Sequence, residues 1–279
     1  RPGEAGPEGP VQATGTGRSG AGVTDNPNFR RWFGKSETVD ADGEPQRLYH
    51  GTNAGKKGDK SFDVLQPPGK GALWLSSDPD FAATFTGGGR RGNAKSGGTP
   101  GATIYPVHAS IQHSLDMRDV KLDTPMSVRE LAKKAGIDPE RFSARVKELK
   151  QPAVDAYLEK YPGSKVADEH GFSFTNKDMP PWTPEENELL SRKRAYEWFD
   201  HPAVNEALQE QGFDGVRWGE SSTLGKKDVK AETWAAFRPT QVKSALANKG
   251  TYDPANPDIR YATRPLPKDE GFQAKEEPF

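Results

Sequence analysis

The chain has 279 residues, of which 32% are hydrophobic and 28% charged, and it carries a formal net charge of −1, 30 glycines, 24 prolines and no cysteine. This composition excludes disulfides and thiolate metal sites, and it gives no general attraction to nucleic acid or to an anionic membrane. No apolar stretch is long enough to span a bilayer, so we expect no membrane partner. Because the composition is too polar for one fully packed globule, we expect a compact core with loosely structured ends.

Residues 1–25 contain seven glycines, three prolines and no aromatic residue, which is typical of a linker. Because the chain begins with Arg1 rather than Met, we expect it to be part of a longer polypeptide. Order is expected from Asn26, which can cap a short helix that starts at Pro27. Residues 36–40 and 44–50 then predict a hairpin.

Residues 72–77 (ALWLSS) predict a second strand, and Asp78 followed by proline predicts the start of a helix. Residues 87–101 form a glycine-rich basic loop that lacks the GK[ST] of a phosphate-binding loop. Residues 102–111 alternate as a strand, in which Pro106 indicates an edge or a bulge.

Residues 126–211 predict five helices, and these start after Ser127, after Asp138, at 152, at 183 and at 202. Two strands follow at 213–218 and 230–238, and the sequence between them predicts a loop. The polar, proline-rich tail from 246 onward is expected to wrap around the domain or to extend from it.

Three features of this arrangement carry chemistry. The first is Tyr49-His50-Gly51-Thr52, in which an imidazole and a hydroxyl flank a glycine at a strand end. The second is Leu73-Trp74-Leu75-Ser76-Ser77-Asp78 followed by Ala82-Ala83-Thr84-Phe85. The third is a late strand that bears a carboxylate. Each of these patterns alone also occurs at the ends of ordinary strands. His108 and His113 have no ligand-like partner nearby in the sequence, so they are better explained as surface or strand histidines than as metal ligands.

Together the three features resemble the ADP-ribosyltransferase superfamily, in its His-Tyr-Glu branch, which includes diphtheria toxin and the poly-ADP-ribose polymerases. More closely, the chain resembles the transferase domains of phage polyvalent proteins and polymorphic toxins. The phrases that carry this likeness are Trp32-Phe33-Gly34, Val39-Asp40-Ala41-Asp42-Gly43, Gly212-Phe213-Asp214-Gly215-Val216, Phe237-Arg238-Pro239-Thr240-Gln241-Val242-Lys243-Ser244-Ala245 and Gly250-Thr251-Tyr252-Asp253-Pro254-Ala255-Asn256-Pro257-Asp258-Ile259.

The resemblance implies an α+β fold in which two packed, mostly antiparallel sheets form an NAD cleft. It places the transferase domain at 26–261, with a helical insert at about 122–211 and a flexible tail at 262–279. It also implies a role for each motif residue. His50 would bond the adenosine ribose, the Gly51 backbone would bond the carboxamide, Thr52, Ser76 and Ser77 would be polar walls, and Phe85 would stack on the nicotinamide in place of the usual tyrosine.

The chemistry also needs a carboxylate. Breaking the bond between nicotinamide and ribose creates positive charge at the ribose carbon, which a carboxylate bonded to the 2′-hydroxyl stabilises. Glu232 in the late strand is the first candidate for this role, and Glu220 is the reserve. If the motif on this strand is displaced by one residue, Thr233 occupies the catalytic position. The simplest alternative is that Glu232 is a surface glutamate without a catalytic role. Lys230 stands where arginine-directed relatives have Glu or Gln, which disfavours that acceptor class.

The predicted function is NAD-dependent ADP-ribosyl transfer to a macromolecular acceptor, with NAD as a substrate and no metal. The alternatives are an NAD glycohydrolase and a catalytically inactive binding or phage structural module. We expect a monomer, a protein acceptor and an immunity protein as a further partner. The expected location is the cytoplasm of a host bacterium, after delivery within a larger phage or toxin polypeptide.

Overall fold

The computed structural model describes residues 23–52, 65, 71–86, 103–175, 192–224, 227–248 and 250–260. Almost all of the predicted linker, the loop at 87–101, the helix start at 183 and the tail at 262–279 lie outside these residues. Among the described residues, no helix combines the length and the apolar character needed to cross a membrane.

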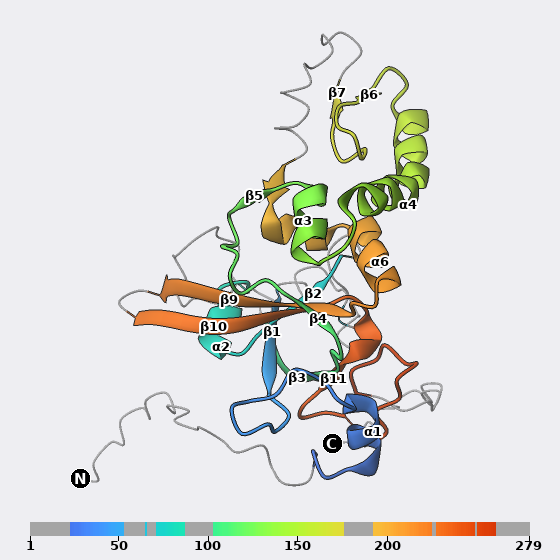
Figure 1. Cartoon of the computed structure of the whole chain (residues 1–279). Coiled ribbons are helices and arrows are strands. Elements are labelled where there is room, and N and C mark those ends of the chain that lie inside the picture. The colour runs from blue at the N-terminus through green and yellow to red at the C-terminus, as the bar shows by residue number, and fades with distance from the viewer. Residues whose placement is uncertain are drawn as a thin grey trace, which may run out of the picture.

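The fold combines helices and strands in one body (Figure 1). The elements in chain order are α1 (Pro27–Phe33), β1 (Leu48–Thr52), β2 (Leu73–Ser76), α2 (Pro79–Ala83), β3 (Thr103–Ala109), β4 (Ser114–Asp116), β5 (Pro125–Met126), α3 (Val128–Lys134), α4 (Pro139–Lys160), β6 (Lys165–Val166), β7 (Phe174–Thr175), β8 (Lys193–Arg194), the 3-10 helix η3 (Ala195–Asp200), α6 (Pro202–Glu210), β9 (Gly215–Leu224), β10 (Lys227–Ala236), the 3-10 helix η4 (Pro239–Gln241) and β11 (Val242–Ser244). The α+β class is therefore confirmed.

Seven strands form one sheet in the order β11-β3-β1-β2-β10-β9-β4, and only the β4–β9 pair is parallel. We expected two packed sheets, whereas these seven strands are hydrogen-bonded into one sheet, and β5–β8 and β6–β7 form two further small sheets. The junction is narrow, because β1 and β2 share a single registered pair, Tyr49 with Ser76. The sheet therefore consists of two halves, β11-β3-β1 and β2-β10-β9-β4, that meet at one point.

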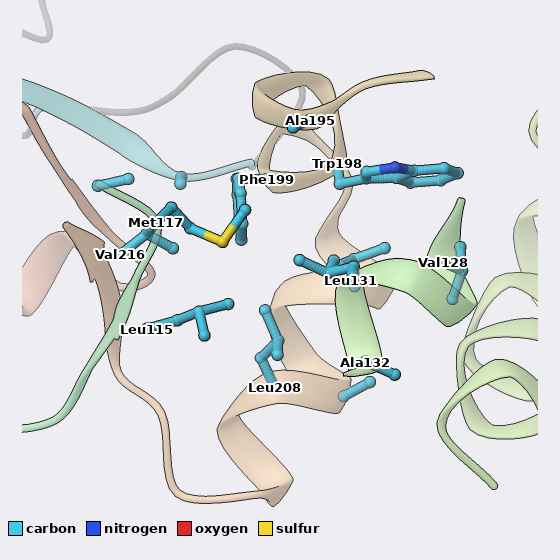
Figure 2. Packing of buried hydrophobic residues seen from close by; sticks show 14 of the residues in the cluster. Leu115, Met117, Val128, Leu131, Ala132, Ala195, Trp198, Phe199, Leu208 and Val216 are labelled. Atoms are coloured by element: carbon cyan, nitrogen blue, oxygen red, sulfur yellow. The ribbon is translucent and has the colours of Figure 1, made fainter. Parts of the chain in front are cut away.

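The helical insert covers one face of the second half. Figure 2 shows Leu115 and Val216 of the sheet, and Met117 just after β4, facing Leu131 and Leu208 of the helices, with Phe199 and Trp198 beside them. A second cluster on the other face includes Leu48, Leu75 and Trp234. Each half of the sheet thus contributes to a packed core, which holds the strands that carry the candidate site residues in place.

Local capping explains the helices that the sequence predicted. Asn26, Asp78 and Ser127 each accept a hydrogen bond from a backbone N–H in the first turn of α1, α2 and α3. In α3 the capping box is complete, because the Glu130 carboxylate accepts from the Ser127 N–H at 2.7 Å.

Two expectations for the insert and the late strands were wrong. The helices expected on either side of Pro152 are one helix, α4, with the proline inside it. A proline removes one hydrogen bond and commonly bends a helix instead of ending it, and α4 changes direction along its length in Figure 1. The loop expected at 219–229 is instead mostly strand, because β9 and β10 pair without interruption from Gly215–Ala236 to Leu224–Lys227.

Pro106 does not mark an edge strand, because β3 pairs with β1 on one side and β11 on the other. The Pro106 carbonyl accepts from the Ala245 N–H at 3.0 Å, on the β11 side and just beyond the last registered pair. Proline has no N–H to donate, and at Pro106 none is needed, because the paired hydrogen bonds between β3 and β11 have already ended there.

The segment 250–260 closes the domain. Tyr252 packs against Phe29 of α1, with ring centroids 5.1 Å apart. The fully buried Lys243 donates from Nζ to the carbonyls of Asn256 and Asp258. Burial lowers the pKa of Lys243 to about 8, so the amine depends on these carbonyls for its solvation.

Candidate functional site

His50 lies where β1 and β2 separate. Its Nδ1 is 2.9 Å from the carbonyl oxygen of Trp74 on β2. Because a carbonyl oxygen can only accept, Nδ1 carries the proton and Nε2 is left as an acceptor. Burial lowers the pKa of His50, an effect larger than the opposing one of the Trp74 carbonyl, so the ring is neutral at pH 7. His50 therefore presents an uncharged acceptor that suits a ligand hydroxyl.

Gly51 has a packing role that the sequence did not reveal. A Cβ at this position would lie 1.9 Å from the carbonyl oxygen of Ala82 in α2. Contacts this close are possible only without a side chain, so Gly51 allows the α2 backbone to lie directly on β1. The glycine at the strand end thus sets the position of the helix that leads to Phe85.

Ser76, Thr233 and Glu220 lie on one face of the sheet. Ser76 pairs with Thr233 and Thr233 with Trp218, while Glu220 pairs with Ala231. Paired residues share a face and alternate residues along a strand return to it. Tyr49, the partner of Ser76, continues the same row onto β1. A transverse row of polar groups therefore crosses this face of the sheet, while His50, the residue after Tyr49, points to the opposite face.

Glu220 has an unusual carboxyl group. Burial raises its pKa to about 7, and the hydroxyl of Thr233 beside it lowers the pKa in part. No ion pair with a lysine or arginine is found for Glu220 in the described part of the chain. A carboxyl that titrates near neutrality without a cation partner is a typical feature of functional sites.

Glu232 points to the opposite face of the same hairpin. Its Oε1 accepts from Arg217 Nε at 2.8 Å and lies 2.6 Å from the Arg217 Nη2. The Arg217 guanidinium in turn lies 5.0 Å from the centroid of the Trp234 ring. The negative charge of Glu232 is thus already compensated by a neighbour on β9.

Ser77 ties the backbone of Glu232 to the end of β2. The Ser77 N–H donates to the Glu232 carbonyl at 2.8 Å, and the Ser77 hydroxyl accepts from the Glu232 N–H at 2.8 Å. The buried Ser76 hydroxyl instead accepts from the Asp78 N–H at 3.0 Å and so holds the start of α2. Both serines therefore position the elements around the site.

The remaining predicted residues lie around β1 and α2. Thr52 ends β1 and pairs with Thr103. Phe85 follows α2, is 58% exposed, and meets Phe81 edge to face at 5.6 Å. Phe81 packs in turn against Ala231 of β10, on the Glu220 face of the sheet. An exposed ring in this position is available to stack on a ligand.

Two residues that the sequence analysis did not single out as site residues also belong to this region. The Trp74 Nε1–H donates to Oδ1 of Asp200 at 3.1 Å, which brings the end of η3 to β2. The two residues are 126 positions apart in the chain, and no local pattern predicts such a contact. Trp74 could have been found, because it lies inside the strand motif that precedes the two serines.

Other potential sites lie elsewhere. A cavity of about 510 Å³ between α4 and the β6–β7 segment is lined by residues such as Val154 and His170, and it borders none of the candidate residues. In the described ranges, no group of three or more His, Cys, Asp or Glu residues is arranged to hold a metal ion.

A family model described as ADP-ribosyltransferase in polyvalent proteins matches residues 40–252, which include every candidate site residue. The chain belongs to this family, and the resemblance drawn from its motifs is confirmed. No curated protein and no solved structure matched the chain. The reaction of the family uses NAD as a substrate.

Proposed function

We propose that the chain transfers ADP-ribose from NAD to a protein acceptor, and that it acts as an effector in the cytoplasm of a host bacterium. The observation that carries this proposal is the neutral His50 at the point where β1 and β2 separate, because the Trp74 carbonyl fixes its Nδ1–H and leaves its Nε2 as an acceptor. The Nε2 of a fixed imidazole can accept a hydrogen bond from one ribose hydroxyl of NAD. A carboxylate on the neighbouring strands can stabilise the positive charge that develops on the other ribose, the one bonded to nicotinamide.

The reaction requires little covalent chemistry from the protein. The bond between the anomeric carbon and the nicotinamide nitrogen breaks, and its electron pair leaves with nicotinamide. A nucleophile of the acceptor then bonds to the anomeric carbon and loses its proton. Throughout, the carboxylate accepts from the ribose 2′-hydroxyl and stabilises the positive charge on the ribose, an interaction that strengthens in the transition state.

Only one of the two candidate carboxylates can serve a single NAD site on one face, because Glu220 and Glu232 point to opposite faces of the β9–β10 hairpin. Two observations support Glu220: it shares its face with Ser76, and no cation partner is found for it among the described residues. Glu232 remains the second candidate, since it lies on the same face as His50, Ser77 fixes its backbone, and the family resemblance places it in the late strand. In this arrangement Thr233 is a neighbour of the carboxylate on the shared face.

Incubation with NAD labelled in the adenylate, with and without bacterial extract, tests the proposal. Label that becomes bound to protein, together with released nicotinamide, supports transfer. Nicotinamide released at the same rate without any labelled acceptor would identify a glycohydrolase instead. A folded protein that binds NAD without cleaving it, with any extract, would be the inactive binding module. Variants at both glutamates serve as controls for the site.

A further inference from the structure

We propose that the helical insert binds a ligand with a positively charged amino group on an apolar stem, in the cavity between α4 and the β6–β7 segment. The cavity holds about 510 Å³ and borders none of the candidate site residues. In Figure 1 the β6–β7 segment lies beyond α3, on the side of the insert that is turned away from the seven-stranded sheet. The site is therefore separate from the one proposed for ADP-ribosyl transfer, and the inference does not depend on that function.

A buried carboxylate lies in the wall of this cavity. Asp168 lines the cavity and is 6% exposed. Its Oδ1 accepts from the backbone N–H of His170 at 2.8 Å and from that of Phe172 at 3.2 Å, which fixes the side chain. Oδ2 has no hydrogen-bond partner among the described residues. A buried carboxylate oxygen is costly unless a donor reaches it, so this atom marks a place for a donor from outside the chain.

The cations near Asp168 are held elsewhere. The Lys150 amine interacts with the charge of Asp168, but it lies 4.9 Å from the centroid of the Phe172 ring, and no ion pair between Lys150 and Asp168 is found in this part of the described chain. Arg129 is bound to Glu169 at 2.6 Å. A positively charged ligand can therefore pair with Asp168 without displacing an existing ion pair.

A second unpartnered group lies in the same wall. His170 is 3% exposed and lines the cavity, and its Nδ1 has no partner among the residues that the structure describes. Its Nε2 lies 2.8 Å from the hydroxyl oxygen of Ser143, a buried residue that is not part of the lining, so this contact orients the ring. Burial lowers the pKa of His170, so the ring is neutral at pH 7 and does not repel a cation.

The rest of the lining suits an apolar stem. Val154 and Leu158 of α4 and Val166 of β6 contribute aliphatic side chains. Lys147 and Glu169 also line the cavity, but both are exposed, so water and salt screen their charges more than that of the buried Asp168. Aliphatic walls around a few fixed polar groups are typical of ligand sites, and here the polar group with an unmatched charge is a carboxylate.

NMR titration of the full chain with n-hexylamine, n-hexanol and hexanoate tests the inference, because the three compounds have similar stems and differ in charge. We expect n-hexylamine to bind with a dissociation constant on the order of 1 mM. The other two should bind at least tenfold more weakly, since a charged donor forms the stronger hydrogen bond with a carboxylate and a second carboxylate is repelled.

Asp168→Asn is the decisive variant. Asparagine keeps an oxygen for the N–H groups of His170 and Phe172 and removes the charge, so the affinity for n-hexylamine should fall about tenfold. Asp155→Asn is the matched control. Asp155 lies on the same helix, accepts from Gln151 at 2.7 Å and is not part of the lining, so this substitution should leave the affinity unchanged.

A short peptide with one lysine and blocked ends distinguishes two sources of the amino group. Competition between this peptide and n-hexylamine would support the inference and identify a lysine side chain of a protein as the ligand. Binding of n-hexylamine without such competition would support it and identify a free amine.

Three outcomes would overturn the inference. Equal binding of n-hexylamine and n-hexanol would show that the cavity takes apolar compounds without regard to charge. Unchanged affinity for n-hexylamine in folded Asp168→Asn would show that another group binds the amine. Absence of n-hexylamine binding by wild type would show that the cavity holds only water. If Asp168→Asn unfolds, Leu158→Trp, which fills part of the cavity and retains the carboxylate, should weaken n-hexylamine binding, and an unchanged affinity would place the amine elsewhere.

Discussion

Glu220 and Glu232 occupy adjacent strands of one hairpin, yet their carboxylates lie on opposite sides of the sheet. Glu220 pairs with Ala231, and Glu232 pairs with Gly219, one position farther along the ladder. The two glutamates therefore differ by one position in the strand pairing. Glu220 lies beside Thr233 and has a pKa of about 7, whereas Glu232 is bound to Arg217. The identity of the catalytic carboxylate depends on which face receives NAD.

Substitution of the two glutamates decides this point. Glu220→Gln should lower the rate of NAD cleavage by about 100- to 1000-fold with little change in NAD affinity, because the charge acts mainly in the transition state. Glu232→Gln should cost less than tenfold. Single-turnover release of nicotinamide measures both. The reverse order of effects would show that NAD binds on the Arg217 face and that Glu232 is the catalytic carboxylate.

The pH dependence gives a second test of Glu220. Because folding raises the pKa of this carboxyl to about 7, the folded state holds its proton more tightly than the unfolded state does. The contribution of the group to stability is present below its unfolded pKa and is lost as pH rises through 7. Urea unfolding from pH 4.5 to 8 should therefore show a loss that Glu220→Gln removes. Cleavage activity should rise over the same range, and an identical stability profile in both proteins would contradict the raised pKa.

His50→Ala should weaken NAD binding by tenfold or more. The substitution removes the Nε2 acceptor, and a lost hydrogen bond of this kind costs about 1–3 kcal/mol. Calorimetry on the folded variant measures the effect, and circular dichroism checks the fold, since the bond to the Trp74 carbonyl is lost too. His113→Ala is the matched control, because His113 also bonds a backbone carbonyl but lies outside the site. Equal NAD affinity in wild type and His50→Ala would remove this motif from the site.

Gly51→Ala tests the packing of α2. A methyl group at this position would overlap the Ala82 carbonyl, and relief of the overlap should destabilise the protein by about 1–3 kcal/mol. Activity should fall as well, because α2 carries the chain toward Phe85. Gly219→Ala is the control, since its nearest neighbours would be 3.9 Å away or more. Thermal unfolding of the two variants side by side gives the answer, and similar midpoints would show that α2 adjusts freely.

The sequence predicted best what is decided locally. Asn26, Asp78 and Ser127 cap helices within one turn of their own position, and a single sequence contains that information. Pro152 was misread because a proline can either end or bend a helix, and the packing of α4 decides which one occurs.

Of the candidate site, the sequence located the first strand and the two serines by local motifs. His50, Ser76 and Ser77 lie in recognisable strand motifs, but the face on which a residue of β10 points depends on its pairing with β2 and β9. A single sequence does not determine this register to within one residue. A change of one residue decides whether Thr233 or Glu232 faces a given side of the sheet. The contact of Asp200 with Trp74 joins two distant segments and has no local signal at all.

The buried amine of Lys243 has a consequence for how this domain is made. Its carbonyl partners, Asn256 and Asp258, are synthesised more than ten residues after it, and the Ser244 N–H likewise pairs with the Ile259 carbonyl. On the ribosome, every strand of the large sheet emerges before these partners do. The fold therefore stays incomplete until its last described residues leave the exit tunnel, so a growing polypeptide carries the completed domain only after this segment has emerged from the ribosome.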